Sequence, residues 1–155
     1  CIAISLAKKH PDSNWIALDV SQEALRIAKE NAISHQAKNI QFLQSDLLSN
    51  INLETVDLIT ANLPYIGNIH FSGVDPNTRK FEPNIALFSG QDGLDLYRKL
   101  SKQLKEQRVN FKYLLAEFAD GQSCSLIEVF RKDFPNRNYQ VIFDLNNKER
   151  ILLIS

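Results

Sequence analysis

The regular alternation of apolar runs with helical patterns constrains the fold of this chain more than any other feature. Short runs that are apolar almost throughout, such as "NWIALDV" and "NIQFLQSD", alternate with segments such as "EALRIAKENAISH", in which apolar residues recur at helical spacing. Strands of this kind are typical of a mostly parallel sheet that helices cover on both faces. The last two runs are joined by "NNK", which is too short for a crossover and predicts an antiparallel hairpin.

The predicted fold class is therefore α/β, with a mostly parallel sheet that ends in a C-terminal antiparallel hairpin. The predicted helices cover residues 1–9, 23–35, 93–107 and 121–134. The predicted strands cover residues 14–20, 39–46, 56–62, 111–118, 139–145 and 149–155. Ser21 is expected to cap the second helix, and Glu23 lies in its first turn, where the helix dipole favours a negative charge.

Length and composition indicate one globular domain over residues 1–155. Hydrophobic residues make up 44% of the 155 residues, which is too high a share for a disordered chain. Lys and Arg number 18 and Asp and Glu number 18, so the chain lacks the overall basic charge of a strong nucleic-acid binder. No segment is long enough for a membrane span. Cys1 and Cys124 have no potential metal ligands at the usual spacing, so we expect no metal site and a cytoplasmic location.

Two acidic residues and one amide follow three of the predicted strands. Asp19, Asp46 and Asn62 each stand at a strand end, and ligands of open parallel sheets bind beyond the carboxyl ends of the strands. Asp19 is placed to accept both ribose hydroxyls of a nucleoside, and Asp46 to accept hydrogen bonds from an adenine amino group. The alternative is that both acids only cap the helices and loops that follow them.

The segment "NLPY", residues 62–65, offers an amide, a fixed backbone and an aromatic ring in consecutive positions. The side-chain oxygen of Asn62 and the carbonyl of Leu63 are both hydrogen-bond acceptors, and Pro64 restricts the backbone on either side of it. Two converging acceptors match the two hydrogens of a substrate –NH₂ group, against whose flat face Tyr65 can lie. The alternative is a turn that uses Asn and Pro for backbone reasons alone.

Four stretches of the chain together resemble one family of enzymes. "DLITANLPYI" resembles the catalytic motif of Rossmann-like class I methyltransferases, which use S-adenosylmethionine. "FEPNIALFSGQDGLDLYRKL", "LLAEFADGQ" and "FDLNNKERILLIS" are similar, in the same order, to segments of the HemK/PrmC family. That family methylates the N5 side-chain amide nitrogen of a glutamine in peptide chain release factors. The resemblance covers essentially the whole chain.

This resemblance implies a role for each candidate residue. Catalytic and substrate-binding roles fall on Asn62, Leu63, Pro64 and Tyr65, although Leu63 stands where most of the family has proline. Glu82 and Pro83 match the family's substrate-pocket pattern. Cofactor binding falls on Asp19, Asp46 and Asn62. Glu117, at the end of a later strand, has no definite role.

The resemblance also implies that the chain is truncated at its N-terminus. The opening "CIAISLA" is similar to the helix after the family's glycine-rich loop, so the first strand and that loop are missing. The missing strand would lie between the strands that end in Asp19 and Asn62. We therefore expect the chain alone to be poorly stable and to bind the cofactor weakly.

The implied partner is a peptide chain release factor, so that contact with nucleic acid is only indirect, through the translation machinery. Two rival functions stay open. "NLPY" is also familiar from adenine dimethyltransferases of ribosomal RNA, which favours an N6 adenine methyltransferase of RNA or DNA. A non-catalytic domain that keeps the fold and the cofactor is the second rival.

Overall fold

The computed structural model of the chain describes residues 1–49, 51–67 and 86–155. These residues form two compact units, Cys1–Asn52 and Leu53–Ser155, which we describe separately. The predicted residues Glu82 and Pro83 lie outside the described residues.

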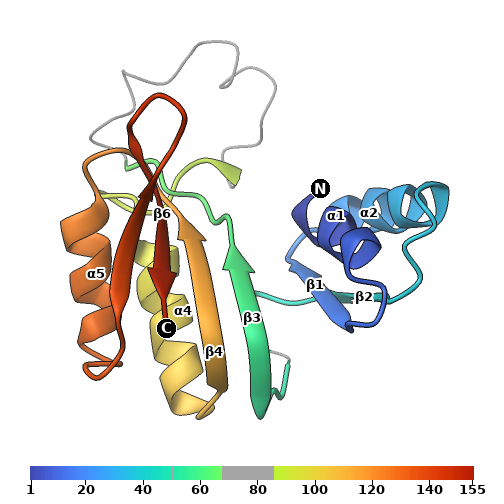
Figure 1. Cartoon of the computed structure of the whole chain (residues 1–155), viewed down its shortest axis with the longest axis horizontal. Helices are drawn as coiled ribbons and strands as arrows, with labels where there is room; N and C mark the ends of the chain where they lie inside the picture. The colour runs from blue at the N-terminus through green and yellow to red at the C-terminus, as the bar shows by residue number, and fades with distance from the viewer. Residues whose placement is uncertain (50, 68–85) are drawn as a thin grey trace. The chain divides into compact units, whose positions relative to one another are not determined.

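The first unit contains two helices and a two-stranded parallel sheet (Figure 1). Its elements are α1 (Ile2–Lys9), β1 (Trp15–Asp19), α2 (Gln22–Ser34) and β2 (Ile40–Gln44). The hydroxyl of Ser21 accepts a hydrogen bond from the backbone N–H of Ala24 at 3.2 Å, which confirms the predicted cap. Small side chains dominate the buried core, which comprises Ile4, Ala7, Ala32 and Ala37 and packs against the half-buried Trp15, Ile40 and Phe42.

The described residues of the second unit form a four-stranded sheet and two helices. Its elements are β3 (Thr55–Ala61), α4 (Asp95–Glu106), β4 (Asn110–Glu117), α5 (Ser123–Arg131), β5 (Tyr139–Phe143) and β6 (Glu149–Ile154). The strand order is β3-β4-β6-β5. β3 and β4 are parallel, whereas β6 runs antiparallel to both of its neighbours, β4 and β5. Helices α4 and α5 pack side by side on the sheet (Figure 1).

Large side chains fill the core of the second unit. On α4, Tyr97, Leu100 and Leu104 recur at helical spacing and are buried, and the ring of Tyr97 meets that of Phe130 edge-on at 6.3 Å between centroids. The large apolar side chains that are fully buried are Tyr97, Phe111, Phe118, Phe130, Leu94, Leu104, Leu114, Leu126, Leu152 and Ile154. This core holds the strand ends from which the candidate site is built.

The predicted helices and strands are confirmed along the described residues, and so are the parallel pairings and the C-terminal hairpin. The strands form two sheets, and β1 and β3 each have a single hydrogen-bonded neighbour among the described residues. The expected strand between β1 and β3 stays a prediction.

Candidate active site

Parallel pairing of β3 with β4 brings the "NLPY" segment and Glu117 to the same edge of the sheet. Ala61, the last residue of β3, is paired with Ala116, one residue before the end of β4. Asn62 therefore leaves its strand beside Glu117. The hydroxyl of Tyr65 donates a hydrogen bond to Oε1 of Glu117 at 3.3 Å. Glu117, which the sequence left without a role, thus contacts the candidate segment directly.

The segment lines a cavity of about 350 Å³. Its walls are residues 62–66 together with Ala86 and Leu87. Asn62 is exposed, whereas Leu63, Pro64 and Tyr65 are half-buried. The predicted catalytic residues are therefore brought together around one concave space, of a size that a side chain and part of a cofactor can enter.

Several polar backbone groups around this segment are hydrogen-bonded. The buried hydroxyl of Tyr97 lies 3.3 Å from the carbonyl of Ala61 and also contacts the carbonyl of Glu117. Burial raises the pKa of Tyr97, and a backbone hydrogen bond from Leu63 partly opposes this rise. The N–H of Ile66 donates to the carbonyl of Leu87 at 3.0 Å, and the carbonyl of Ile66 accepts from the N–H of Ser89 at 3.0 Å. The backbone of the segment is thus fixed by its surroundings.

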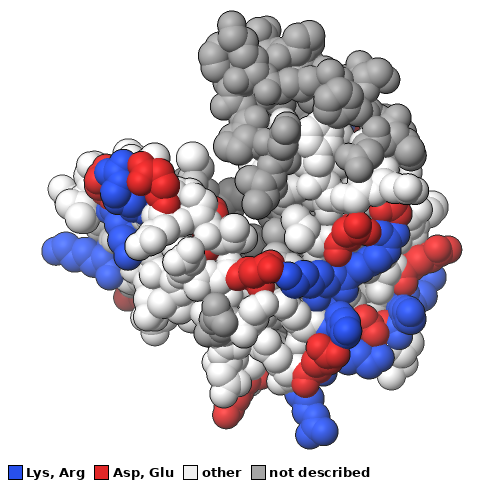
Figure 2. Space-filling view, turned by 180° about the vertical axis from the view of Figure 1, so that it is seen from behind, with Lys and Arg blue, Asp and Glu red and all other residues white. Residues whose placement is uncertain are grey.

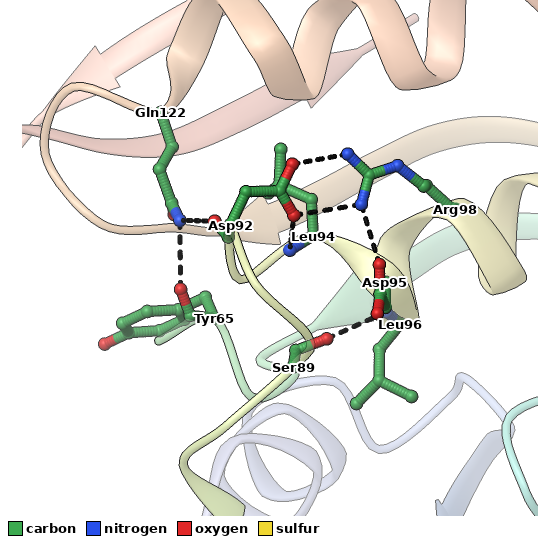
Figure 3. Close-up of polar contacts among 8 residues, drawn as sticks. All are labelled: Tyr65, Ser89, Asp92, Leu94, Asp95, Leu96, Arg98 and Gln122. Atoms are coloured by element: carbon green, nitrogen blue, oxygen red, sulfur yellow. Dashed lines mark hydrogen bonds and ion pairs between the residues drawn. The ribbon is translucent and has the colours of Figure 1, made fainter. Parts of the chain in front are cut away.

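A loop before α4 packs closely against the segment (Figure 3). A Cβ on Gly93 would lie 2.1 Å from the carbonyl oxygen of Tyr65, so only glycine permits this approach, and its φ of +85° also favours glycine. The side-chain amide of Gln122 donates to the carbonyl of Tyr65 at 3.0 Å and to that of Asp92 at 2.8 Å. Its oxygen accepts from the N–H of Ala119 at 2.9 Å. Gln122 therefore joins three backbone segments.

An ion pair stabilises the same loop. Arg98 of α4 bonds both carboxylate oxygens of Asp92 and one of Asp95 (Figure 3). Oδ1 of Asp92 also accepts from the N–H of Leu94 at 3.1 Å. The hydrogen bond from Arg98 is the main reason that the pKa of Asp92 falls to about 2. The carboxylate of Asp92 is thereby kept charged and in place at the start of α4.

Two acceptors at the cavity remain unused. Within residues 1–49, 51–67 and 86–155, the carboxamide of Asn62 and the carbonyl of Leu63 accept no hydrogen bond. Pro64, which follows Leu63, has no N–H of its own. The two acceptors that the sequence singled out are thus free of partners among the described residues, whereas the carbonyls of Ala61 and Tyr65 accept hydrogen bonds.

Burial raises the pKa of the Tyr65 hydroxyl, and the charge of Glu117 adds to this effect, while Arg150 opposes it. Tyr65 is therefore a neutral donor at physiological pH and is not suited to act as a base. Its hydroxyl bond to Glu117 holds the ring beside the cavity.

In the first unit, Asp19 and Asp46 lie at the same end of the parallel pair β1 and β2. Asp19 is the last residue of β1 and is paired with Gln44, two residues before Asp46. Both acids are exposed. One carboxylate oxygen of Asp19 accepts the N–H of Ser21 at 2.8 Å, so part of the capping alternative is observed. Two exposed carboxylates at neighbouring strand ends also fit the hydroxyls and amino group of a nucleoside. Their binding role stays a prediction.

The sequence assigned no role to Tyr97, Gln122 or the pair of Asp92 and Arg98. Their contacts with the "NLPY" segment and the neighbouring loop depend on the packing of segments that are far apart in the chain. The contact of Tyr97 with Ala61 spans 36 residues and that of Gln122 with Tyr65 spans 57. The only available signal was the similarity of "GQDGLDLYR" and "LLAEFADGQ" to the family pattern.

Comparison with known proteins places the chain among methyltransferases. The family model described as "Methyltransferase small domain" matches residues 1–72, a range that contains both acids and the "NLPY" segment. A release factor glutamine methyltransferase of Streptococcus pneumoniae is 34% identical over 153 residues, which cover 99% of this chain and 54% of that protein. One of Bacillus cereus is 31% identical, over 97% of this chain and 54% of that protein. The chain is a relative of the release factor glutamine methyltransferases.

The chain spans about half the length of these relatives. Among solved structures, the catalytic domain of hMettl16 in complex with MAT2A 3'UTR hairpin 1 superposes with a TM-score of 0.72. It is 18% identical, and the match covers 100% of this chain and 60% of that one. This likeness shows the fold, a Rossmann-like α/β methyltransferase fold, and so confirms the fold class predicted from the sequence.

The described residues contain neither a membrane-spanning helix nor a metal-binding cluster. No helix there is long and apolar enough to cross a membrane. No group of three or more His, Cys, Asp or Glu side chains there is arranged to hold a metal ion.

Proposed function

We propose that the protein carrying this chain transfers a methyl group from S-adenosylmethionine to the side-chain amide nitrogen of a glutamine in a peptide chain release factor. The observation that carries the proposal is the pair of acceptors formed by the Asn62 side chain and the Leu63 carbonyl, which line one cavity and accept no hydrogen bond from the described residues. The relationship to release factor glutamine methyltransferases supports the same substrate.

The two acceptors would act on the nucleophile, which is the less reactive of the two reactants. An amide nitrogen is a poor nucleophile because its lone pair is shared with the carbonyl group. Hydrogen bonds from the –NH₂ group to Asn62 and to the carbonyl of Leu63 would hold the nitrogen in one orientation. The same bonds would stabilise the positive charge that develops on the nitrogen as its bond to carbon forms. The nitrogen then loses a proton to water, because a protonated N-methyl amide is strongly acidic, and no general base is required.

The cofactor, when bound, would supply an electrophilic methyl group on a sulfonium sulfur, and the sulfur would keep the electron pair of the broken sulfur–methyl bond and leave as the neutral thioether S-adenosylhomocysteine. Asp19 and Asp46 would hold its ribose hydroxyls and its adenine amino group, and Asn62 would lie beside its reactive end. Exposed carboxylates at the ends of neighbouring parallel strands suit this task. Within the proposal, residues 1–155 act as one methyltransferase domain in the cytoplasm. Glu82 and Pro83 remain part of the proposed substrate pocket.

An adenine methyltransferase of RNA or DNA is the second candidate, favoured by the fold shared with a protein solved in complex with a 3'UTR hairpin. Such an enzyme needs a basic surface for phosphate groups. On the face that Figure 2 shows, Lys and Arg side chains are interspersed with Asp and Glu side chains. On α4, Arg98 is paired with Asp92 and Lys105 with Asp133. These pairs and the neutral net charge favour the protein substrate.

The proposal is tested by locating the transferred methyl. The complete gene product is incubated with S-adenosylmethionine and a release factor, and the factor's peptides are analysed by mass spectrometry. We expect one added methyl on one glutamine, absent when that glutamine is replaced by alanine and when Asn62 is replaced by alanine. Cofactor binding with no transfer to the factor, but with transfer to RNA, would establish the second candidate instead. Cofactor binding with no transfer to any acceptor would favour a non-catalytic domain.

A further inference from the structure

We propose that Tyr97 and Gln122 are positioning residues, which fix the backbone on either side of the acceptor pair formed by Asn62 and the Leu63 carbonyl. Neither side chain is expected to touch the substrate. The inference rests on the proposed function for its kinetic consequences, whereas its structural content stands independently.

Tyr97 fixes the N-terminal side of the pair. It is fully buried on α4, and its hydroxyl lies between the carbonyls of Ala61 and Glu117. One phenol oxygen therefore joins the end of β3 to the end of β4. Since α4 is packed into the core through Leu100 and Leu104, this anchor is rigid.

Gln122 fixes the C-terminal side. Its amide nitrogen donates to the carbonyls of Tyr65 and Asp92, and its oxygen accepts the N–H of Ala119 (Figure 3). All three bonds are between 2.8 and 3.0 Å, so both the nitrogen and the oxygen of the amide form hydrogen bonds of ordinary length. The figure shows the Gln122 side chain reaching from the start of α5 to the Tyr65 backbone.

The residues around the contact of Gln122 with Tyr65 are closely packed. A Cβ on Gly93 would lie 2.7 Å from the amide nitrogen of Gln122, and a Cβ on Gly67 would lie 2.3 Å from the carbonyl of Gln91. The loop before α4 therefore lies directly against residues 65–67. A displacement of Tyr65 would have to move this loop as well, so the Gln122 bond is supported by packing on its far side.

Fixing both sides matters because the two acceptors between them are not held directly by hydrogen bonds among the described residues. The carboxamide of Asn62 and the carbonyl of Leu63 accept no hydrogen bond from any other described residue. The position of the Leu63 carbonyl, and of the Cα from which the Asn62 side chain extends, therefore depends on the backbone of residues 61–65. Misplacement of a reacting group by about 1 Å can reduce a rate about a hundredfold. Tyr97 and Gln122 would therefore affect turnover without touching substrate.

Two single substitutions test this inference in the complete gene product. Tyr97→Phe removes only the hydroxyl, and its matched control is Tyr139→Phe, because the Tyr139 hydroxyl also donates to a backbone carbonyl, that of Phe134, at 2.8 Å. Gln122→Glu keeps the acceptor for Ala119 but removes the donor, and its control for added charge is Gln140→Glu on the exposed side of β5.

The first readout is amide hydrogen exchange of the peptide that covers residues 61–67. We expect exchange to accelerate at least about fivefold in Tyr97→Phe and Gln122→Glu and to stay unchanged in both controls. This readout needs no methyl acceptor, so it remains decisive if the proposed function fails. Unchanged exchange in both variants overturns the inference, whether or not the melting temperature falls.

The second readout is the split between turnover and binding. We expect kcat to fall about tenfold or more in each variant, while the Kd for S-adenosylmethionine stays within about threefold. In an Asn62→Ala background, Tyr97→Phe should lower kcat by a smaller factor than in the wild type, because half of the positioned pair is already absent. An equal factor in both backgrounds, or a kcat that follows only the loss of melting temperature, would indicate a merely structural role and overturn the inference.

Discussion

The two regions proposed to bind the reactants differ in how firmly they are held. The "NLPY" segment of the second unit has its backbone bonded to Tyr97, Gln122 and the loop before α4. Asp19 and Asp46 of the first unit are exposed side chains at the ends of a two-stranded sheet. The segment proposed to orient a poor nucleophile is thus held by bonds from distant parts of the chain, whereas the bond described for the Asp19 carboxylate is local, from the N–H of Ser21.

The cores of the two units also differ, in the size of the side chains that they bury. The second unit buries four aromatic side chains completely, those of Tyr97, Phe111, Phe118 and Phe130. In the first unit three of the six buried hydrophobic residues are alanine, and the aromatic rings of Trp15 and Phe42 are only partly buried. The firmly held site therefore belongs to the unit with the better-filled core, as expected if precise orientation needs a rigid scaffold.

The largest expected effect is that of Asn62→Ala. Loss of one charge-stabilising acceptor should lower kcat on the order of a hundredfold or more, because such bonds act mainly in the transition state. Stopped assays at saturating cofactor and release factor measure kcat directly. Asn136→Ala, in the exposed turn after α5, is the control. Equal turnover of Asn62→Ala and the wild type would remove Asn62 from the mechanism.

The next largest effect tests the less firmly held region. Asp19→Asn should raise the Kd for S-adenosylmethionine about tenfold or more, because hydrogen bonds to a charged acceptor contribute about 1.5–3 kcal/mol. kcat at saturating cofactor should stay nearly unchanged. Titration calorimetry gives the Kd. An unchanged Kd would leave Asp19 with the one role already visible, its hydrogen bond to Ser21.

A smaller effect tests the difference between the two cores. Trp15 is the only tryptophan of the chain and packs on the core of the first unit, so its fluorescence reports that unit. We expect the Trp15 transition in urea to precede the far-UV circular dichroism transition by about 0.5 M or more, because less apolar surface is buried there. Coincident transitions would show that the two units unfold as one.

The smallest effect concerns Asp92, whose pKa of about 2 lies below the ordinary value of an aspartate. Because the pKa of Asp92 is lower in the folded state than in the unfolded state, its charge stabilises the folded state at any pH above the unfolded-state pKa. This contribution is lost as the pH falls through the folded-state pKa of about 2. The carboxylate is 44% exposed, so its contribution is at most about 1 kcal/mol. Asp92→Asn should therefore be less stable than the wild type at pH 7 and equally stable near pH 2.

Urea denaturation of both proteins at several pH values measures this difference. Arg98 is the ion-pair partner of Asp92. The double variant Arg98→Gln, Asp92→Asn should therefore lose less free energy of unfolding than the two single variants lose in total. A stability difference that stays constant from pH 7 to pH 2 would contradict the role of the Asp92 charge.

The sequence was sufficient for the elements and for the central segment. Apolar runs, the Ser21 cap and the short hairpin link are local signals, and the corresponding elements are all observed. Residues 62–65 were also proposed from a local signal, the two acceptors of Asn62 and Leu63 beside the restricted backbone of Pro64, and their role stays a prediction. The two-sided support by Tyr97 and Gln122 was not visible, because it depends on the three-dimensional packing of α4 and α5 against distant strand ends.

The most direct test of the central claim is a structure of the complete gene product with S-adenosylhomocysteine and a peptide that contains the acceptor glutamine. The claim is that Asn62 and the carbonyl of Leu63 together hold the amide nitrogen. We predict that this nitrogen lies within about 3.2 Å of both the side-chain oxygen of Asn62 and the carbonyl oxygen of Leu63. A glutamine bound in the cavity with its amide nitrogen farther than about 3.5 Å from both oxygens would contradict the claim.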